Sequence, residues 1–269
     1  IKSAIADMGC DQFEILVVDD GSSDGTGDAA KKAGAKVMRK PQNIGYGHSL
    51  KVGIREATYD TIVITDADGT YPVDKIPELV KRYNEGFNMV VGARTGPHYR
   101  GSAIKGPLRL ILKFLVEFST GRSIPDANSG LRVFSRNEAM AFFNQLSDGF
   151  SFTTSITLGY MLKKKYVSYI EIPYMERIGK SKVRTFRDSI RTIFFITGAI
   201  VYYTPLKLFL LLSFLLLSIG CLSLLVGLFY LITTTILFGI GCILVSLIIF
   251  SLGLLANFLQ QIMISAGKE

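Results

Sequence analysis

The stretch Phe13-Glu14-Ile15-Leu16-Val17-Val18-Asp19-Asp20-Gly21-Ser22-Ser23-Asp24-Gly25 (residues 13–25) runs from an apolar, β-branched segment straight into a polar cluster that contains glycine. The apolar part is typical of a strand that is buried on both faces. The polar part is typical of a loop, and we expect a helix to follow it as far as about Lys32. A buried strand, a loop and a helix form the repeating unit of parallel α/β sheets.

The same unit recurs along the first hundred residues. Further apolar strands are predicted at 35–39, 61–64 and 88–93, with helical segments between them. Strand and helix therefore alternate four times, which predicts a parallel, doubly wound α/β sheet. Ligands of such sheets bind outside the carboxyl ends of the strands, so polar residues at those ends are candidate site residues.

Two pairs of carboxylates stand at predicted strand ends. Asp66-Ala67-Asp68 follows the strand at 61–64, and Asp19-Asp20 follows the first strand. Mg²⁺ and Mn²⁺ prefer carboxylate oxygens and share their remaining positions with substrate phosphates, so Asp66 and Asp68 are the predicted metal ligands. Asp19 and Asp20 suit the ribose hydroxyls and base N–H groups of a nucleotide. The alternative for each pair is an ordinary polar turn.

The C-terminal part has a different composition. The sixty residues from Leu208 to Gly267 contain no Asp, Glu, Lys, Arg or His, which excludes a purely soluble protein. Segments at about 208–231 and 236–258 are each long enough to cross a bilayer, and the link 232–235 makes them a hairpin. The alternative is two buried core helices. Glycine and serine in the spans permit close packing within the hairpin or in a homo-oligomer.

The chain has an excess of basic residues and a formal net charge of +8, which points to an anionic partner. Five of them lie between Glu85 and Glu117, where the apolar spacing predicts an amphipathic helix, and a second basic stretch occupies 176–204. We interpret both as membrane-surface segments rather than nucleic-acid sites, although the first could be an ordinary helix packed on the sheet. Since the charge precedes an uncharged hairpin link, the domain and the C-terminus are predicted to face the cytoplasm. The three scattered cysteines form neither a disulfide framework nor a metal cluster.

Six segments in order resemble family 2 glycosyltransferases with the GT-A fold, the Rossmann-like fold of nucleotide-diphospho-sugar transferases. They are Val17 to Thr26 (first signature), Asn43-Ile44-Gly45-Tyr46-Gly47 (N-x-G-x-G), Asp66-Ala67-Asp68 (D-x-D), Gly92-Ala93-Arg94 (G-S-R), Asp126 to Arg132 (D-x-x-S-G-F-R acceptor loop) and Arg177 to Lys182 (R-x-G-x-S-K). The last two, with a C-terminal hairpin, are similar to the dolichyl- or polyprenyl-phosphate sugar synthases, among them the dolichyl-phosphate mannose synthases.

The resemblance divides the chain into three parts. It implies a GT-A catalytic domain at 1–175, a basic amphipathic interfacial segment at 176–204 and a transmembrane hairpin at 205–269. The first strand of the family, with its P-x-Y-N-E segment, is absent from the sequence, and the first residues are typical of the end of a helix. We therefore expect the natural chain to begin earlier. The sequence differs from the family pattern directly after Asp68 and at 152–155, where many relatives have F-x-x-E. The resemblance therefore does not identify the sugar that is transferred.

The implied activity is that of a membrane-bound, inverting hexosyltransferase. It would move a hexose from a UDP- or GDP-sugar to undecaprenyl or dolichyl phosphate on the cytoplasmic face of a cell or ER-type membrane, with Mg²⁺ or Mn²⁺. The implied catalytic residues are Asp66, Asp68 and Arg132, and the implied donor-binding residues are Asp19, Asp20, Gly45, Asp66, Ala67 and Asp68. An acceptor phosphate is already anionic and needs a positive cradle rather than a general base. The candidates for that cradle are Arg94, Arg109, Ser129, Arg132, Arg177 and Lys180.

Three other functions remain as alternatives. A processive polysaccharide synthase shares the fold, but it would use a Q-x-x-R-W motif and this chain has no Trp. A non-catalytic membrane anchor would not need Asp66, Asp68 and Arg132. A small transporter subunit would need ionisable residues in its spans, and the predicted spans contain none.

Overall fold

The computed structural model describes residues 1–97, 106–176 and 185–266, and for 106–112, 185–191 and 264 it describes the backbone alone. The chain divides into two compact units, Ile1–Ile196 and Thr197–Glu269, with the division inside helix α8. The predicted α/β domain lies in the first unit, and the predicted hairpin lies in the second.

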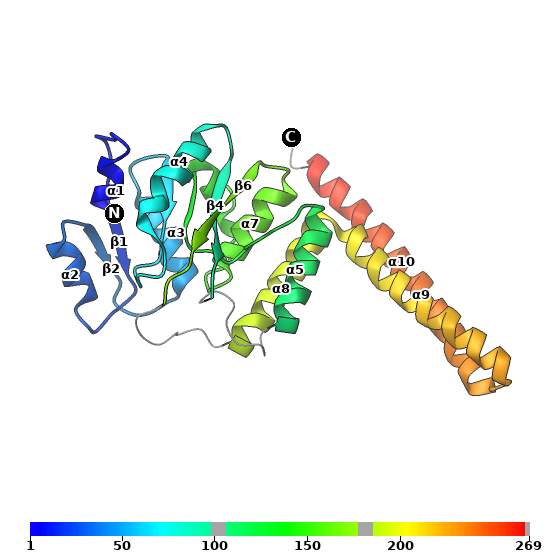
Figure 1. The fold of residues 1–269 in the computed structure, drawn as a ribbon. Helices are drawn as coiled ribbons and strands as arrows, with labels where there is room; N and C mark the ends of the chain where they lie inside the picture. Colours follow the sequence, from blue (N-terminus) through cyan, green and yellow to red (C-terminus); the bar gives the residue numbers. More distant parts are fainter. Residues whose placement is uncertain (98–105, 177–184, 267–269) are drawn as a thin grey trace. The chain divides into compact units, whose positions relative to one another are not determined.

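The strands of the first unit form two separate sheets (Figure 1). In one sheet, β1 (Leu16–Asp19) pairs in parallel with β2 (Lys36–Arg39). The other has the order β3-β5-β4-β6, with β3 at Thr61–Ile64, β5 at Arg132–Ser135, β4 at Met89–Thr95 and β6 at Val167–Pro173. Strand β5 runs antiparallel to both neighbours, whereas β4 and β6 are parallel. The prediction of one parallel sheet was therefore wrong in this detail, because β5 enters between β3 and β4 in the opposite direction.

Helices surround both sheets. In chain order they are α1 (Lys2–Ala6), α2 (Thr26–Lys32), α3 (Tyr46–Glu56), the 3₁₀ turn η1 (Val73–Lys75), α4 (Ile76–Asn84), α5 (Gly106–Thr120), α6 (Arg136–Met140), η3 (Phe143–Gln145), α7 (Phe152–Leu162) and α8 (Thr185–Tyr203). Gly25 allows the sharp entry into α2 with φ +78°, and Pro77 occupies the first turn of α4.

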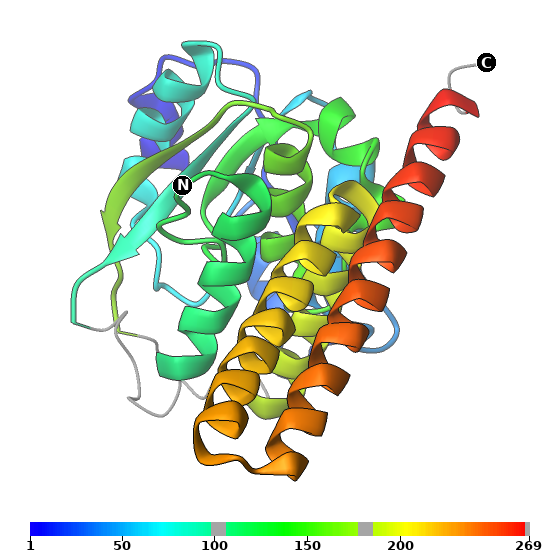
Figure 2. The same cartoon turned by 90° about the vertical axis from the view of Figure 1, so that its right-hand side faces the viewer.

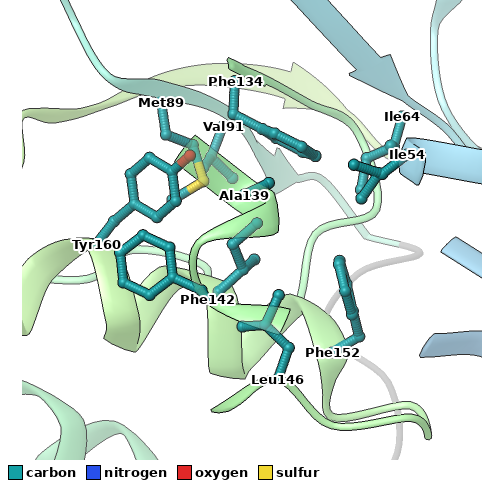
Figure 3. Close-up of a cluster of buried hydrophobic side chains, with 11 residues drawn as sticks. Ile54, Ile64, Met89, Val91, Phe134, Ala139, Phe142, Leu146, Phe152 and Tyr160 are labelled. Atoms are coloured by element: carbon teal, nitrogen blue, oxygen red, sulfur yellow. The ribbon is translucent and has the colours of Figure 1, made fainter. Parts of the chain in front are cut away.

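The four-stranded sheet has an apolar core on each face. Met89 and Val91 of β4 point to one face and Val90 to the other, as the two-residue period of a strand requires. The first core includes Ile54 of α3, Ala139 of α6, Phe142 from the turn after α6, and Phe152 and Tyr160 of α7 (Figure 3). The second core contains Ile76 and Leu79 from the α4 side. The sheet is thus fixed between two helical layers.

A cavity of about 1940 Å³ separates β1 from β3. Both strands line it, together with Leu50 of α3, Ile5 of α1 and Val80 of α4. Because no strand of the described chain pairs with these two facing edges, most of β1 and β3 is only half-buried. The cavity continues past the carboxyl ends of both strands to the predicted site residues.

The second unit is a helical hairpin, in which α9 (Pro205–Tyr230) and α10 (Thr233–Ala266) run side by side (Figure 2). Both are long and apolar enough to cross a membrane, as predicted, although α10 extends eight residues beyond its predicted end. Ser213 and Ser246 exchange hydrogen bonds to each other's carbonyls at 3.0 Å. A Cβ on Gly220 would stand 3.0 Å from the Gly239 carbonyl, so the small residues serve close packing within the hairpin. Association with a second copy stays a prediction.

Candidate active site

Asp66 and Asp68 stand in a loop directly after β3, which we call the aspartate loop (residues 65–70). Asp66 Oδ1 accepts a hydrogen bond from the Tyr46 hydroxyl at 2.9 Å. Asp68 Oδ1 accepts from the backbone N–H and the hydroxyl of Thr70, at 3.2 and 2.6 Å. Asp66, Ala67 and Asp68 all line the cavity, so the structure brings the predicted metal ligands together on its wall.

The aspartate loop fits a hard divalent cation that keeps part of its coordination shell open. Within the described residues, no group of three or more His, Cys, Asp or Glu side chains could hold a metal ion by itself. Two carboxylates facing a cavity leave the remaining positions to water and to a ligand, which is how Mg²⁺ is commonly held in phosphate-binding sites. The donor set is entirely oxygen and therefore suits Mg²⁺ or Mn²⁺.

Asp19 and Asp20, at the end of β1, also line the cavity. Asp19 Oδ2 is buried without a hydrogen bond and lies 3.7 Å from Arg39 Nε, whereas the other oxygens of the pair are bonded within the protein. Asp19 Oδ1 accepts from the Ser22 backbone N–H at 2.8 Å, a bond that lowers the pKa of Asp19. Burial by itself would raise the pKa of Asp20. Hydrogen bonds from Lys40 and from the N–H groups of Ile44 and Gly45 outweigh burial and lower this pKa. Asp20 therefore fixes the 43–45 loop beside the cavity.

Tyr46, which follows that loop, is held from two sides. Its ring stacks on Phe150, with ring centroids 5.8 Å apart and planes at 13°. Gly45 has φ +135°, and a Cβ there would be 2.8 Å from the Asp148 carbonyl, so only glycine fits. Burial, reinforced by Asp66, raises the pKa of Tyr46 well above its usual value. The hydroxyl thus stays protonated and can donate to Asp66.

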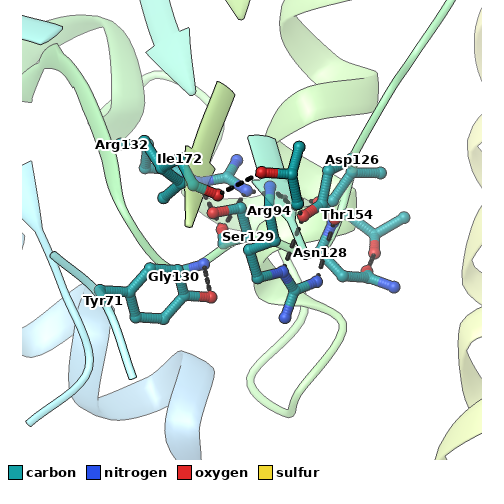
Figure 4. Close-up of polar contacts among 11 residues, drawn as sticks. Tyr71, Arg94, Asp126, Asn128, Ser129, Gly130, Arg132, Thr154 and Ile172 are labelled. Carbon is teal, nitrogen blue, oxygen red and sulfur yellow. Dashed lines mark hydrogen bonds and ion pairs between the residues drawn. The ribbon is translucent and has the colours of Figure 1, made fainter. Parts of the chain in front are cut away.

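A second loop, residues 126–130, lines the cavity through Asp126, Ala127 and Asn128, and we call it the 126–130 loop. Asp126 forms a two-point ion pair with Arg94 at 2.7 and 3.0 Å (Figure 4). Arg94 also lies over the Tyr174 ring at 5.2 Å. The hydroxyl of Tyr71 accepts from the Gly130 N–H at 2.6 Å. Asn128 accepts a hydrogen bond from Thr154 of α7. The loop is therefore anchored at both ends and in the middle.

Arg132 lies behind this loop rather than on the cavity wall. Its side chain is 0% exposed, and burial lowers the pKa of its guanidinium. The guanidinium donates to the carbonyls of Ala127, Ser129 and Thr153 and to the Thr157 hydroxyl. Ser129 is also fully buried. The structure therefore gives Arg132 the contacts of a residue that holds the loop in shape, and its predicted contact with a phosphate has no support in this geometry.

Two described cations reach the cavity on this side. They are Arg94, which is paired with Asp126, and Lys113 of α5, whose side chain is 49% exposed and lies 3.9 Å from Glu117. The other predicted cations, Arg109, Arg177 and Lys180, have side chains outside the described residues. Sequence reasoning did not select Lys113, Tyr46 or Tyr71 as site residues. Lys113 belongs to a basic stretch that the sequence does reveal, and Tyr46 stands at a variable position of the N-x-G-x-G segment, whereas Tyr71 has no local signal.

The comparisons with known proteins agree on one family. A family model for glycosyl transferase family 2 matches residues 1–141. The low-salt glycan biosynthesis hexosyltransferase Agl6 of Haloferax volcanii is 31% identical over 205 residues, which are 72% of this chain and 48% of that protein. The dolichyl-phosphate hexose transferase of the same organism is 26% identical over 195 residues, 69% of this chain and 82% of that protein.

A third relative and a solved structure complete the comparison. The dolichol-phosphate mannosyltransferase of Pyrococcus furiosus is 29% identical over 64% of this chain and 51% of its own length. This chain thus spans about half the length of Agl6 and of the mannosyltransferase. Glucosyl-3-phosphoglycerate synthase of Mycobacterium tuberculosis, in complex with Mn²⁺, UDP and glucosyl-3-phosphoglycerate, has a TM-score of 0.59 at 18% identity, over 73% of this chain and 72% of that one. The likeness shows the predicted GT-A fold.

Proposed function

Because this chain belongs to glycosyl transferase family 2, we propose that it transfers a hexose from a nucleotide-sugar to a polyprenyl phosphate at a membrane. Three relatives named as hexosyl- or mannosyltransferases, two of them acting on a dolichyl or dolichol phosphate, support the reaction class. The two membrane-length helices support a lipid acceptor. We further infer that the catalytic unit faces the cytoplasm, since the basic residues precede the uncharged hairpin link.

The donor side of the proposed site is the wall that carries Asp19, Asp20, Gly45 and the aspartate loop. Asp66 and Asp68 would hold Mg²⁺ or Mn²⁺ against the diphosphate of the donor. When bound, the metal supplies positive charge that offsets the charge on the leaving nucleotide. The Tyr46 and Thr70 hydroxyls hold the two carboxylates in place before the donor arrives. Such preorganisation avoids rearrangement during the reaction.

The observation that carries the choice of acceptor is the ion pair between Asp126 and Arg94. A hydroxyl acceptor needs a general base within hydrogen-bond reach. Among the described cavity-lining residues that follow Arg94 in the sequence, Asp126 is the only carboxylate. Both oxygens of Asp126 accept hydrogen bonds from the Arg94 guanidinium. A phosphate monoester needs no base, because its second pKa is about 6 and it is anionic near neutrality.

The same wall combines hydroxyls, a cation and apolar side chains. Thr153 and Thr154 of α7 and Lys113 of α5 could hold the phosphate oxygens, while Val116, Ile124, Phe150 and Ile196 offer an apolar path for the prenyl chain. A single in-line displacement, in which the acceptor phosphate replaces the nucleotide, inverts the configuration of the anomeric carbon. An α-linked donor would therefore give a β-linked lipid product.

A transfer assay on the full chain in detergent tests this function. The protein is incubated with undecaprenyl or dolichyl phosphate, Mg²⁺ or Mn²⁺, and labelled UDP- and GDP-hexoses, and label in the organic phase is measured. We expect label from one donor, lost with a chelator and with Asp68→Asn. Asp74→Asn, an exposed carboxylate outside the cavity, is the matched control and should remain active. A folded wild-type chain that labels no lipid phosphate from any donor contradicts the proposed function.

A further inference from the structure

We propose that Tyr71 is a positioning residue that ties the 126–130 loop to the aspartate loop, so that nucleotide with metal and lipid phosphate each strengthen the binding of the other. The inference rests on the proposed function, because it takes the aspartate loop as the donor side of the site and the 126–130 loop as the acceptor side. It adds a physical link between the two sides.

The position of Tyr71 in the chain makes it part of the donor side. It directly follows Thr70, whose N–H and hydroxyl hold Asp68. The Thr70 carbonyl in turn accepts from the Met175 N–H at 3.0 Å, which fixes the backbone just after β6 to this turn. Tyr71 itself is 5% exposed and packs edge-to-face on Tyr174, with centroids 5.5 Å apart and planes at 73°. A shift of Asp68 therefore carries Tyr71 with it.

The hydroxyl of Tyr71 reaches the acceptor side. It accepts the backbone N–H of Gly130 at 2.6 Å, across 59 positions of sequence. A second contact joins the same two loops, because Gly130 lies against the other aspartate. A Cβ built on Gly130 would be 2.8 Å from Asp66 Oδ2. One residue of the 126–130 loop thus touches both the tyrosine that follows Asp68 and the carboxylate of Asp66.

The rest of the 126–130 loop is stiff enough to transmit a movement. Arg132 binds the carbonyls of Ala127 and Ser129, which locks the internal shape of the loop. The Asp126 end is held by Arg94 (Figure 4). Arg94 in turn packs over the ring of Tyr174, which contacts Tyr71. The contacts thus run from the 126–130 loop through Arg94 and Tyr174 back to Tyr71, forming a closed circuit of packed side chains. We therefore expect the loop to move as one rigid body.

The consequence is a binding linkage between the two substrates. A donor that orders the aspartate loop also places Gly130 and Asp126 for the acceptor, and the reverse holds by thermodynamic reciprocity. Removing the Tyr71 hydroxyl leaves the buried Gly130 N–H without this acceptor while the ring keeps its contact with Tyr174. Tyr71→Phe should therefore weaken the linkage while leaving the metal ligands in place.

Calorimetric titration of the full chain in detergent measures the linkage directly. The probes are UDP and GDP with Mn²⁺, titrated with and without undecaprenyl phosphate. For the wild type we expect undecaprenyl phosphate to tighten nucleotide binding by roughly fivefold or more, within the usual range of coupled sites. In Tyr71→Phe the ratio of the nucleotide Kd without undecaprenyl phosphate to the Kd with it should fall close to one. The nucleotide affinity in the absence of lipid should stay within about threefold of wild type. The KM for undecaprenyl phosphate should rise about tenfold, the scale of one lost buried hydrogen bond.

Tyr83→Phe is the matched control, since Tyr83 is a half-buried tyrosine on α4 that does not line the cavity. It should keep the linkage. Equal linkage in Tyr71→Phe and wild type would overturn the inference, and so would a wild type that binds both substrates with no linkage. A wild type that binds nucleotide but does not transfer to lipid phosphate would instead overturn the proposed function.

Hydrogen exchange on the wild-type chain provides a measurement that needs no variant. Adding Mn²⁺ with the nucleotide that binds, and no lipid, should slow amide exchange in the peptide containing the 126–130 loop. A peptide from the turn at 163–166, none of whose residues lines the cavity, serves as the internal reference. Unchanged exchange in the 126–130 loop, in a chain that demonstrably binds the nucleotide, would overturn the inference even if Tyr71→Phe did not fold.

Discussion

Gly130→Ala should impair the site by displacing Asp66 without disturbing the backbone. The new Cβ would lie 2.8 Å from Asp66 Oδ2 and 3.0 Å from Oδ1 and Cγ, whereas ordinary contact begins at 3.4 Å. The carboxylate must therefore move by about 0.6 Å, which strains or breaks its 2.9 Å bond from Tyr46. Gly130 is absent from the glycines with positive φ, so alanine is compatible with its backbone.

The expected loss of activity follows from that displacement. A misplacement of about 1 Å at a reacting centre can cost about 100-fold in rate, so 0.6 Å should reduce kcat/KM by roughly 10- to 100-fold. The assay is the initial rate of transfer to undecaprenyl phosphate, with a Mn²⁺ titration in which the half-saturating concentration should rise. Thermal unfolding should stay within a few degrees of wild type.

A glycine with open space around it provides the control for this variant. Gly198 in α8 has no neighbouring atom within 4 Å of a built Cβ, so Gly198→Ala should leave the rate unchanged. A Gly130→Ala enzyme with kcat/KM within twofold of wild type would mean that Asp66 tolerates the shift or takes no part in the reaction, contrary to the role we assign it.

Three further variants probe separate contacts. Tyr46→Phe removes the hydrogen bond to Asp66 and should raise the half-saturating Mn²⁺ concentration about fivefold to tenfold, and an unchanged Mn²⁺ titration would contradict this role. Arg132→Lys cannot satisfy the four groups that the guanidinium bonds, and should lower the free energy of unfolding by about 2–5 kcal/mol in urea denaturation, whereas a cost under about 1 kcal/mol would argue against the network. Ser213→Ala combined with Ser246→Ala should cost only about 0.6–1.7 kcal/mol in hairpin stability measured in detergent, and a loss well beyond that range would mean that these serines do more than pair with each other.

The parts of the fold that could be predicted are those with a strong local pattern. The apolar runs ending in acidic loops located β1 and β3, and the uncharged tail located both long helices. Strands β5 and β6 were both missed. Strand β5 begins with an arginine, and its place is set by pairing with β3 on one side and β4 on the other. Strand β6 is fixed by its parallel pairing with β4. The division into two sheets was not predicted either, since the positions of the strands along the sequence do not show which strands pair with each other.

The candidate site shows the same limit. Asp66 and Asp68 could be placed together because they are neighbours in sequence. The contacts of Tyr46 with Asp66 and of Tyr71 with Gly130 join residues 20 and 59 positions apart, and no local pattern predicts them. Arg132 illustrates the converse case. A cation in a polar loop looks exposed, but carbonyls of its own loop and of α7 surround it completely.

If the phosphate of a polyprenyl phosphate is itself the nucleophile, as we propose, the enzyme must distinguish a lipid phosphate from the corresponding free alcohol. Wild-type chain in detergent is given Mn²⁺, the active labelled nucleotide-hexose and either undecaprenyl phosphate or undecaprenol, and the lipid products are identified by mass. We expect a hexosyl phospholipid from undecaprenyl phosphate and no product from undecaprenol, because the described wall beside Asp126 offers no general base that is not already paired. Hexosylated undecaprenol formed at a comparable rate would show that the phosphate is not required as the nucleophile.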